Sequence, residues 1–205
     1  MRIEQNKDDT AKVWMTYPED LRKIESVINQ QDDINPKRVV VELMANVGLR
    51  VDRVVWVSHA DVKRTSDGQD YLLKVRGAKD TTGDYNDGKS RDVYIPDSVE
   101  RLIFERQVRN ELEENEAVID VTPRTVQNWV SEIGEKMAER HNDDDWTYLS
   151  CHDFRRSYAN HLIHDTDIQA SVIMNQLGWE DWSTLKNYTD NPSEKVIQNE
   201  FAELS

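Results

Sequence analysis

Hydrophobic and polar residues repeat along most of this chain with the spacing of amphipathic helices. Residues 36–48 are a clear case, because their apolar side chains fall on one helical face. The members of that face are Val40, Leu43 and Met44. Gly48 is a typical residue at a helix C-terminus, so we predict that the helix ends there and that Arg50 lies just beyond it.

The same reasoning predicts further helices before and after this one. Their expected ranges are 16–31, 97–114, 122–141, 151–164, 167–178, a short helix that contains Tyr188, and a tail helix at 193–205. Thr122 and Ser150 are favourable N-cap residues for two of these helices, and Pro123 suits a first helical position.

Residues 70–96 follow a different pattern. Strand-forming residues occur at both ends, in YLLKVRGAK and SRDVYIP, and the segment between them is rich in Gly and Asp. This pattern predicts an antiparallel β-hairpin with a long tip. Together with the helices, it predicts an α+β fold that is mainly helical and has a small antiparallel β-hairpin or sheet.

Length and composition suit one large domain, since the chain has 205 residues of which 37% are hydrophobic. We expect a flexible N-terminal tail at 1–13, the main domain at 14–190 and the tail helix within 191–205. The sequence has no apolar run long enough to cross a membrane, and its N-terminus is too polar for a signal peptide, so we expect a cytoplasmic protein. The single cysteine, Cys151, cannot form an internal disulfide.

The charge balance argues against a nucleic-acid partner. Acidic residues outnumber basic ones 40 to 26, and the net charge is -14; affinity for a phosphate backbone comes largely from Lys and Arg. Such an acidic surface is typical of proteins from a salty cytoplasm. Net charge averages over all faces, however, so one basic strip can survive. Its candidate members are Arg50, Arg53, Lys79, Lys89, Arg91, Arg155 and Arg156.

The C-terminal region concentrates side chains that handle phosphate. The run CHDFRRSYANHLI contains His152 and Arg155, and QLGWEDWSTLKNYTD contains Trp179 and Tyr188. An Arg presents a planar fork of donors to phosphate oxygens, a His moves protons near neutrality, and a Tyr hydroxyl can attack phosphorus. The set therefore indicates chemistry on a phosphodiester.

The order of these motifs, from about Trp14 to the C-terminus, resembles the catalytic domain of the tyrosine recombinases, the phage-integrase and Xer family. The family's Gly-Leu-Arg element matches NVGLRVDRV, its hairpin Lys after a Gly matches YLLKVRGAK, and its Tyr follows the Leu-Gly-Trp element by nine positions. The matching residues in chain order are Arg50, Lys79, His152, Arg155, Trp179 and Tyr188.

The resemblance implies site-specific DNA recombination, for integration or excision, through a covalent 3′-phosphotyrosine at Tyr188, with no metal and no nucleotide cofactor. Arg50 and Arg155 would stabilise the transition state. Lys79 would protonate the leaving oxygen, although the long hairpin tip leaves Lys89 as an alternative.

His152 would assist proton transfer or bind the phosphate, and Trp179 would donate its N–H and pack the site. One departure concerns the position three residues after Arg50: relatives usually carry an acidic residue there, and this chain has Arg53, with Asp52 just before it.

The resemblance also implies double-stranded DNA as the partner and a tetramer on DNA in the family. We expect a monomer without DNA, no membrane association, and no N-terminal core-binding domain in this chain. The tail helix either docks on a neighbouring protomer or packs on its own core.

Three alternatives lead to other activities. One predicted helix carries four possible metal ligands, Cys151, His152, His161 and His164. However, Cys151 and His152 point about 100° apart on a helix, and no outlying Cys pair completes a zinc pattern. We therefore expect no metal site. A recombinase-derived module that binds DNA without cleaving it remains open. So does a nicking-and-closing enzyme of the topoisomerase IB type.

Overall fold

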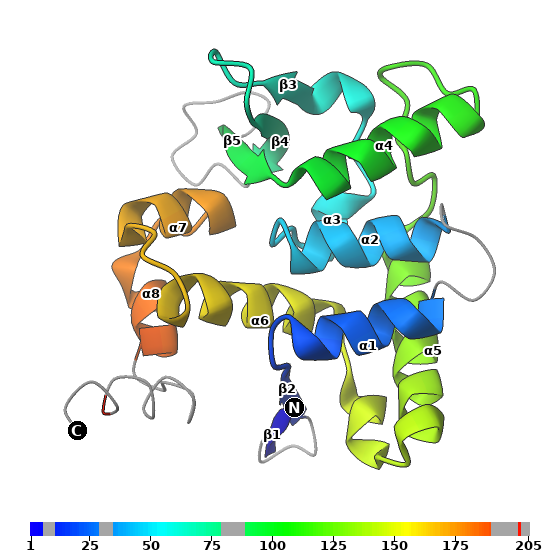
Figure 1. Ribbon diagram of the computed structural model, residues 1–205, viewed down its shortest axis with the longest axis vertical. Coiled ribbons are helices and arrows are strands. Elements are labelled where there is room, and N and C mark those ends of the chain that lie inside the picture. The colour runs from blue at the N-terminus through cyan, green and yellow to red at the C-terminus, as the bar shows by residue number, and fades with distance from the viewer. Residues whose placement is uncertain (6–10, 29–34, 79–88, 190–200, 202–205) are drawn as a thin grey trace.

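A computed structural model describes residues 1–5, 11–28, 35–78, 89–189 and 201. The fold is mainly helical with two small antiparallel sheets, which confirms the α+β prediction (Figure 1). The helices are α1 (Glu19–Ile28), α2 (Pro36–Ala45), α3 (Val51–Val54), α4 (Asp97–Arg109), α5 (Pro123–His141), α6 (Cys151–His164), α7 (Ala170–Leu177) and α8 (Trp182–Thr189), with 3-10 turns at His59–Asp61 and Asp144–Tyr148. The strands are β1 (Arg2–Gln5), β2 (Ala11–Trp14), β3 (Val62–Arg64), β4 (Tyr71–Ala78) and β5 (Lys89–Ile95).

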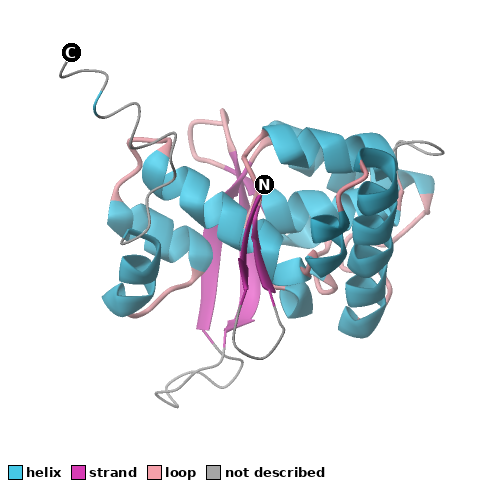
Figure 2. Cartoon of the chain, turned by 90° about the horizontal axis from the view of Figure 1, so that it is seen from below, coloured by secondary structure: helices cyan, strands magenta, loops and turns pink. Residues whose placement is uncertain are grey.

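The predicted hairpin forms the larger sheet. Strands β3, β4 and β5 lie in that order, all antiparallel, and Leu73 on β4 is opposite Val93 on β5. Leu73 and Val75 are buried whereas Lys74 between them is exposed, so one face of the sheet contacts the core. Figure 2 shows the strands between two groups of helices.

The predicted caps explain where the later helices begin and end. The Thr122 hydroxyl accepts a hydrogen bond from the Thr125 N–H at 3.2 Å, and Pro123 is the first residue of α5. Ser150 and Asp153 form a capping box at the start of α6, with the Ser150 N–H donating to the Asp153 carboxylate at 2.8 Å. Gly178, with φ of +58°, ends α7.

The buried side chains form two clusters that α6 connects. The main cluster packs α1, α2, α4 and α5 together, and Phe154 near the start of α6 belongs to it. The second cluster is smaller and joins the rest of α6 to α7 and α8. Its members are Tyr158, Ala159, Leu162, Ile173, Met174, Leu177, Trp179 and Leu185. The helix α6 therefore runs from the main core to the second cluster through the middle of the molecule (Figure 1).

The expectation of a flexible tail at 1–13 differs from the structure in the part that is described. Strands β1 and β2 pair there, and Val13 is fully buried. The Val13 N–H donates to the Asp153 carboxylate at 3.1 Å, and the Met15 N–H donates to the Ser157 hydroxyl at 3.0 Å. Both partners lie on α6, about 140 residues away, so local sequence does not reveal them.

Several boundaries also differ from prediction. The first helix starts at Glu19 and not at 16, the helix expected at 97–114 ends at Arg109, and α7 starts at Ala170 and not at 167. Most of the expected tail helix lies outside the described residues, and so does Lys79. None of the helices in the described ranges is long and apolar enough to cross a membrane.

Candidate active site

Arg50 is placed by a tight turn at the end of α2. Gly48 has a φ of +76°, and the Leu49 N–H donates back to the Leu43 carbonyl at 3.1 Å. A Cβ at Gly48 would lie 2.7 Å from the Leu177 side chain and 2.9 Å from the Tyr158 ring, so a larger residue does not fit. The next helix begins directly after Arg50, whose side chain is exposed and has no hydrogen bond or ion pair to another described residue.

Arg155 lies behind Arg50 and is almost completely buried, with 2% of its surface exposed. Its guanidinium donates to the carbonyl oxygens of Gly48 and Leu177, which precede the turns that hold Arg50 and Trp179. Burial, together with the nearby charges of Arg50 and Arg91, lowers the pKa of Arg155 to about 9, so it still carries its charge at neutral pH. A guanidinium has five N–H groups, so donors remain for a ligand.

Tyr188 is carried on α8 and lies near Arg50 and Arg155. Its ring stacks on Trp179 with centroids 4.9 Å apart, and Trp14 packs against it edge-on at 6.1 Å. His164 Nε2 lies 3.1 Å from the Tyr188 carbonyl oxygen, which fixes the end of α8 against α6. Burial raises the pKa of the Tyr188 phenol, while the guanidiniums of Arg156, Arg155 and Arg50 act in the opposite direction. The phenol therefore lies within electrostatic reach of those three charges.

His152 occupies the first turn of α6 with an exposed side chain. Partial desolvation and the charges of Arg156 and Arg155 lower the pKa of His152, so the imidazole is neutral at pH 7. Arg156 is engaged elsewhere: it hydrogen-bonds Asp153 and lies 5.4 Å from the centre of the Trp14 ring. The structure thus brings together five of the six predicted site residues, namely Arg50, His152, Arg155, Trp179 and Tyr188.

Residues 15–195 match the phage integrase family. The chain belongs to this family. A search of curated protein sequences found no match. Among solved structures, the chain is similar to XerA recombinase, with a TM-score of 0.69, 17% identity, and coverage of 93% of this chain and 64% of that chain.

Two further solved structures show the same fold. The XerH recombinase in a pre-cleavage complex with its difH substrate matches with a TM-score of 0.63 and 16% identity, over 91% of this chain and 56% of that chain. The catalytic domain of bacteriophage HP1 integrase matches with a TM-score of 0.59 and 13% identity, over 93% of this chain and 95% of that chain. The chain therefore spans less than two thirds of the XerA and XerH proteins.

The family's hairpin lysine is not assigned by the structure. Lys79 lies outside the described residues, and although Lys89 begins β5, its side chain is not described. The choice between them stays a prediction.

The residue that departs from the family pattern, Arg53, contacts strand β4 and its neighbour Asp52. It donates to the Arg76 carbonyl oxygen at 3.1 Å and pairs with Asp52 at 3.4 Å. The Asp52 carboxylate also lies near enough to Arg155 to raise its pKa. Asp52 is thus an acidic group near Arg155, one position earlier than the family pattern expects.

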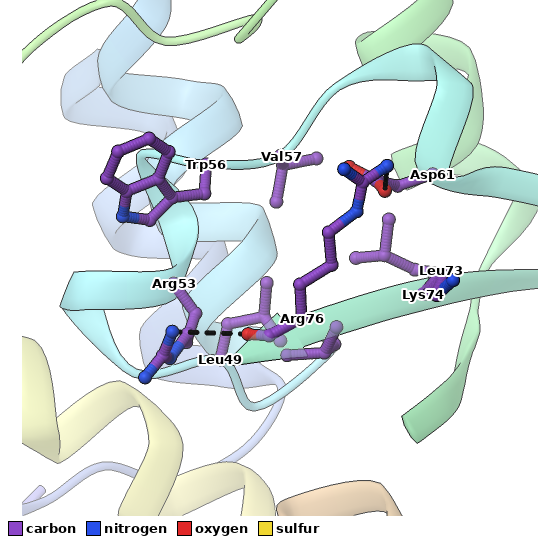
Figure 3. A pocket seen from close by; sticks show the side chains of 9 residues that line it. Leu49, Arg53, Trp56, Val57, Asp61, Leu73, Lys74 and Arg76 are labelled. Atoms are coloured by element: carbon purple, nitrogen blue, oxygen red, sulfur yellow. Dashed lines mark hydrogen bonds and ion pairs between the residues drawn. The ribbon is translucent and has the colours of Figure 1, made fainter. Parts of the chain in front are cut away.

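A shallow pocket lies beside the integrase site, between α3 and β4 (Figure 3). Arg53 lines it, and the Arg76 guanidinium is 2.5 Å from the Asp61 carboxylate across it. Trp56 at its edge is 72% exposed. None of the described catalytic candidates lines this pocket, so the pocket is a separate surface feature.

Sequence reasoning missed Gln176, which joins α7 to the edge of the sheet. Its amide accepts from the Tyr94 N–H at 2.9 Å and donates to the carbonyl oxygens of Tyr94 and Val47 at 2.9 and 3.1 Å. The signal in the sequence is the pair of amides, Asn175 and Gln176, near the end of a mainly apolar helix. Gln176 replaces a neighbouring strand at this point, since β5 is an edge strand of its sheet.

Two residues of the metal site that the sequence argues against make other contacts or carry a raised pKa in the structure. The His161 ring stacks on Tyr17 with centroids 4.1 Å apart, and its Nδ1 lies 3.0 Å from Asp165. Burial raises the pKa of the Cys151 thiol to about 11, which makes it a weak nucleophile at neutral pH.

Proposed function

We propose that this integrase-family chain performs site-specific DNA recombination, cleaving and rejoining strands through a covalent 3′-phosphotyrosine for integration or excision. The observation that carries the proposal is the packing of Tyr188 on Trp179, two residues after Leu177, whose carbonyl accepts a hydrogen bond from the buried Arg155. Double-stranded DNA is the partner, in line with relatives such as XerH and the Tn1549 transposon integrase, which were crystallised in complex with DNA. Without DNA, the chain is a monomer, and it assembles with other protomers on DNA.

In the proposed reaction, the Tyr188 oxygen forms a bond to phosphorus as the bond to the 5′ oxygen of the next nucleotide breaks. The ester is exchanged and not hydrolysed, so the released 5′-hydroxyl can attack the phosphotyrosine and restore the strand. Arg50 and Arg155 stabilise the additional negative charge of the five-coordinate transition state. Loss of either costs about 10²–10³ in rate.

Two proton transfers accompany the exchange. The hairpin lysine, Lys79 or its alternative Lys89, protonates the departing 5′ oxygen. The phenol must lose its proton, which burial of Tyr188 opposes and the nearby guanidiniums favour. His152 is neutral at pH 7 because its pKa is lowered, and a neutral imidazole can accept a proton. Trp179 has only an N–H donor, so it packs against Tyr188 and takes no part in proton transfer.

A suicide duplex tests the proposal. A nick placed so that the short 5′ fragment diffuses away after cleavage traps the protein on DNA that contains its recombination site. We expect the wild type to form a covalent adduct, Tyr188→Phe to form none, and Tyr148→Phe, at an exposed position in a 3-10 turn, to match the wild type. Equal trapping by Tyr188→Phe would remove Tyr188 from the role.

The same assay separates the two other activities. A module that binds DNA without cleaving it would shift the duplex in a gel and give no adduct. A nicking-and-closing enzyme would relax supercoiled plasmids regardless of their sequence.

A further inference from the structure

Arg91 on β5 lies inside the candidate site, although no role in the reaction is assigned to it above. Its guanidinium packs directly on Gly178, the residue that ends α7 with a φ of +58°. A Cβ at Gly178 would lie 2.6 Å from the Arg91 guanidinium carbon and 2.7 Å from its Nη1. The absence of a side chain at Gly178 therefore makes the space that Arg91 occupies.

The Arg91 guanidinium has no counter-charge in the structure as described. Its Nε is buried without a hydrogen-bond partner, and no described carboxylate pairs with it. Its charged neighbours are Arg50 and Arg53, and burial together with these like charges lowers the pKa of Arg91 to about 10. Burying an unpaired charge is unfavourable, and an anion bound beside Arg91 would offset that cost.

The backbone that carries Arg91 is held firmly. The Asn175 amide donates to the Asp92 carbonyl at 3.1 Å, and Gln176 makes two hydrogen bonds to the Tyr94 backbone. Both donors come from α7, which ends at Gly178. The strand that carries Arg91 is therefore fixed against α7.

We propose that Arg91 is a third guanidinium that binds the same phosphate as Arg50 and Arg155, an inference that rests on the proposed function. Arg155 is near both other guanidiniums and already donates to two backbone carbonyls. Arg91 therefore adds donors for a phosphate oxygen to those that remain on Arg155. Three guanidiniums around one phosphate match the charge of the transition state better than two.

Inorganic phosphate is the probe for a first test, because it needs no knowledge of the DNA site. Thermal unfolding of the whole chain is followed in increasing phosphate, against chloride at equal ionic strength, and the affinity is obtained from the shift in Tm. We expect Arg91→Gln to bind phosphate about tenfold more weakly than the wild type, from the loss of one charged hydrogen bond. Arg124→Gln, the same charge change at an exposed site on α5, should bind like the wild type.

The same experiment separates a ligand-binding role from a structural one. Without phosphate, Arg91→Gln should unfold at the wild-type temperature or above it, because an unpaired charge is removed. If Arg91 had only a structural role, Arg91→Gln would have a lower Tm than the wild type without phosphate and the same affinity for phosphate. That result would overturn the proposal.

Gly178→Ala provides a second variant that leaves Arg91 in the sequence. The matched control is Gly68→Ala, because Gly68 has a φ of +72° with nothing within 4 Å of its missing Cβ. Both variants carry the strain of a positive φ, but only Gly178→Ala displaces the guanidinium. We expect weaker phosphate binding for Gly178→Ala alone; equal affinities would contradict the inference.

A double-mutant cycle decides whether Arg50 and Arg91 share one anion. If they bind the same phosphate, the loss in affinity of the Arg50→Gln, Arg91→Gln double variant differs from the product of the single losses. Strictly multiplicative losses would assign Arg91 to a different anion and overturn the proposal. Phosphate binding is measured without DNA cleavage, so this failure is distinguishable from failure of the adduct assay.

Discussion

The two halves of the candidate site are built differently. The guanidinium half is built into the interior: Arg155 is almost completely buried, and its guanidinium donates to the carbonyls of Gly48, just after α2, and of Leu177, at the end of α7. The nucleophile half is an eight-residue helix, α8, that packs on the smaller cluster through Leu185. Beyond that contact, Tyr188 is held by the Trp179 and Trp14 rings and by His164 at its carbonyl.

This difference indicates that one half of the site is rigid and that the other half can move. Buried, hydrogen-bonded groups in a main core open only with global unfolding, whereas short elements with few buried contacts open at much lower free energy. The half proposed to bind phosphate is thus preorganised by the fold, while the proposed nucleophile is carried on a short helix that we expect to separate from it more easily. Substitutions in the two halves should therefore change different observables.

The largest expected effect is at Arg155. Arg155→Gln should reduce adduct formation about 10²–10³-fold and lower the free energy of unfolding by about 1–3 kcal/mol, because two buried carbonyls lose their donors. Tyr188→Phe should also abolish the adduct but change the free energy of unfolding by only about 0.5 kcal/mol. Urea unfolding of both variants measures the contrast. Equal destabilisation by the two substitutions would break the comparison.

A smaller effect is expected where α8 packs on its cluster. Leu185→Ala removes the buried anchor of α8, so backbone amides of α8 should exchange with solvent faster while those of α2 and α5 keep their protection. Adduct formation should fall severalfold because the helix is docked less of the time. The matched control is Leu43→Ala in the main core, which should destabilise the whole domain by about 2–5 kcal/mol. Uniformly faster exchange in Leu185→Ala would show that the two clusters unfold as one.

The sequence predicted those parts of the fold that depend on neighbours along the chain. Helix caps such as Ser150 and Thr122, and the turn at Gly48 that precedes Arg50, follow from local hydrogen bonding and backbone conformation. The ordered family motifs then located Arg155 and Tyr188.

The missed parts depend on contacts between distant segments. Gln176 bonds Tyr94 across 82 positions, Asp153 anchors Val13 across 140, and Arg91 fits into the space left by Gly178. Each requires two elements to meet in a particular register, which a single sequence does not display. The prediction of a flexible tail at 1–13 differs from the described strands for this reason, since Val13 and Met15 bond to residues of α6 that lie far away in the sequence.

The smallest expected effect concerns His152 and the dependence of stability on pH. Its pKa is lowered in the folded protein from the ordinary value of 6.5, so below pH 6.5 the unfolded chain binds the proton more readily. Stability that is present at pH 7 is therefore lost as the pH falls through 6.5 toward the folded pKa. His152→Gln should show a slightly flatter fall in Tm between pH 7 and pH 5 than the wild type. A steeper fall in His152→Gln would mean that the imidazole is stabilised in its charged form, and the neutral His152 proposed as proton acceptor would then be wrong.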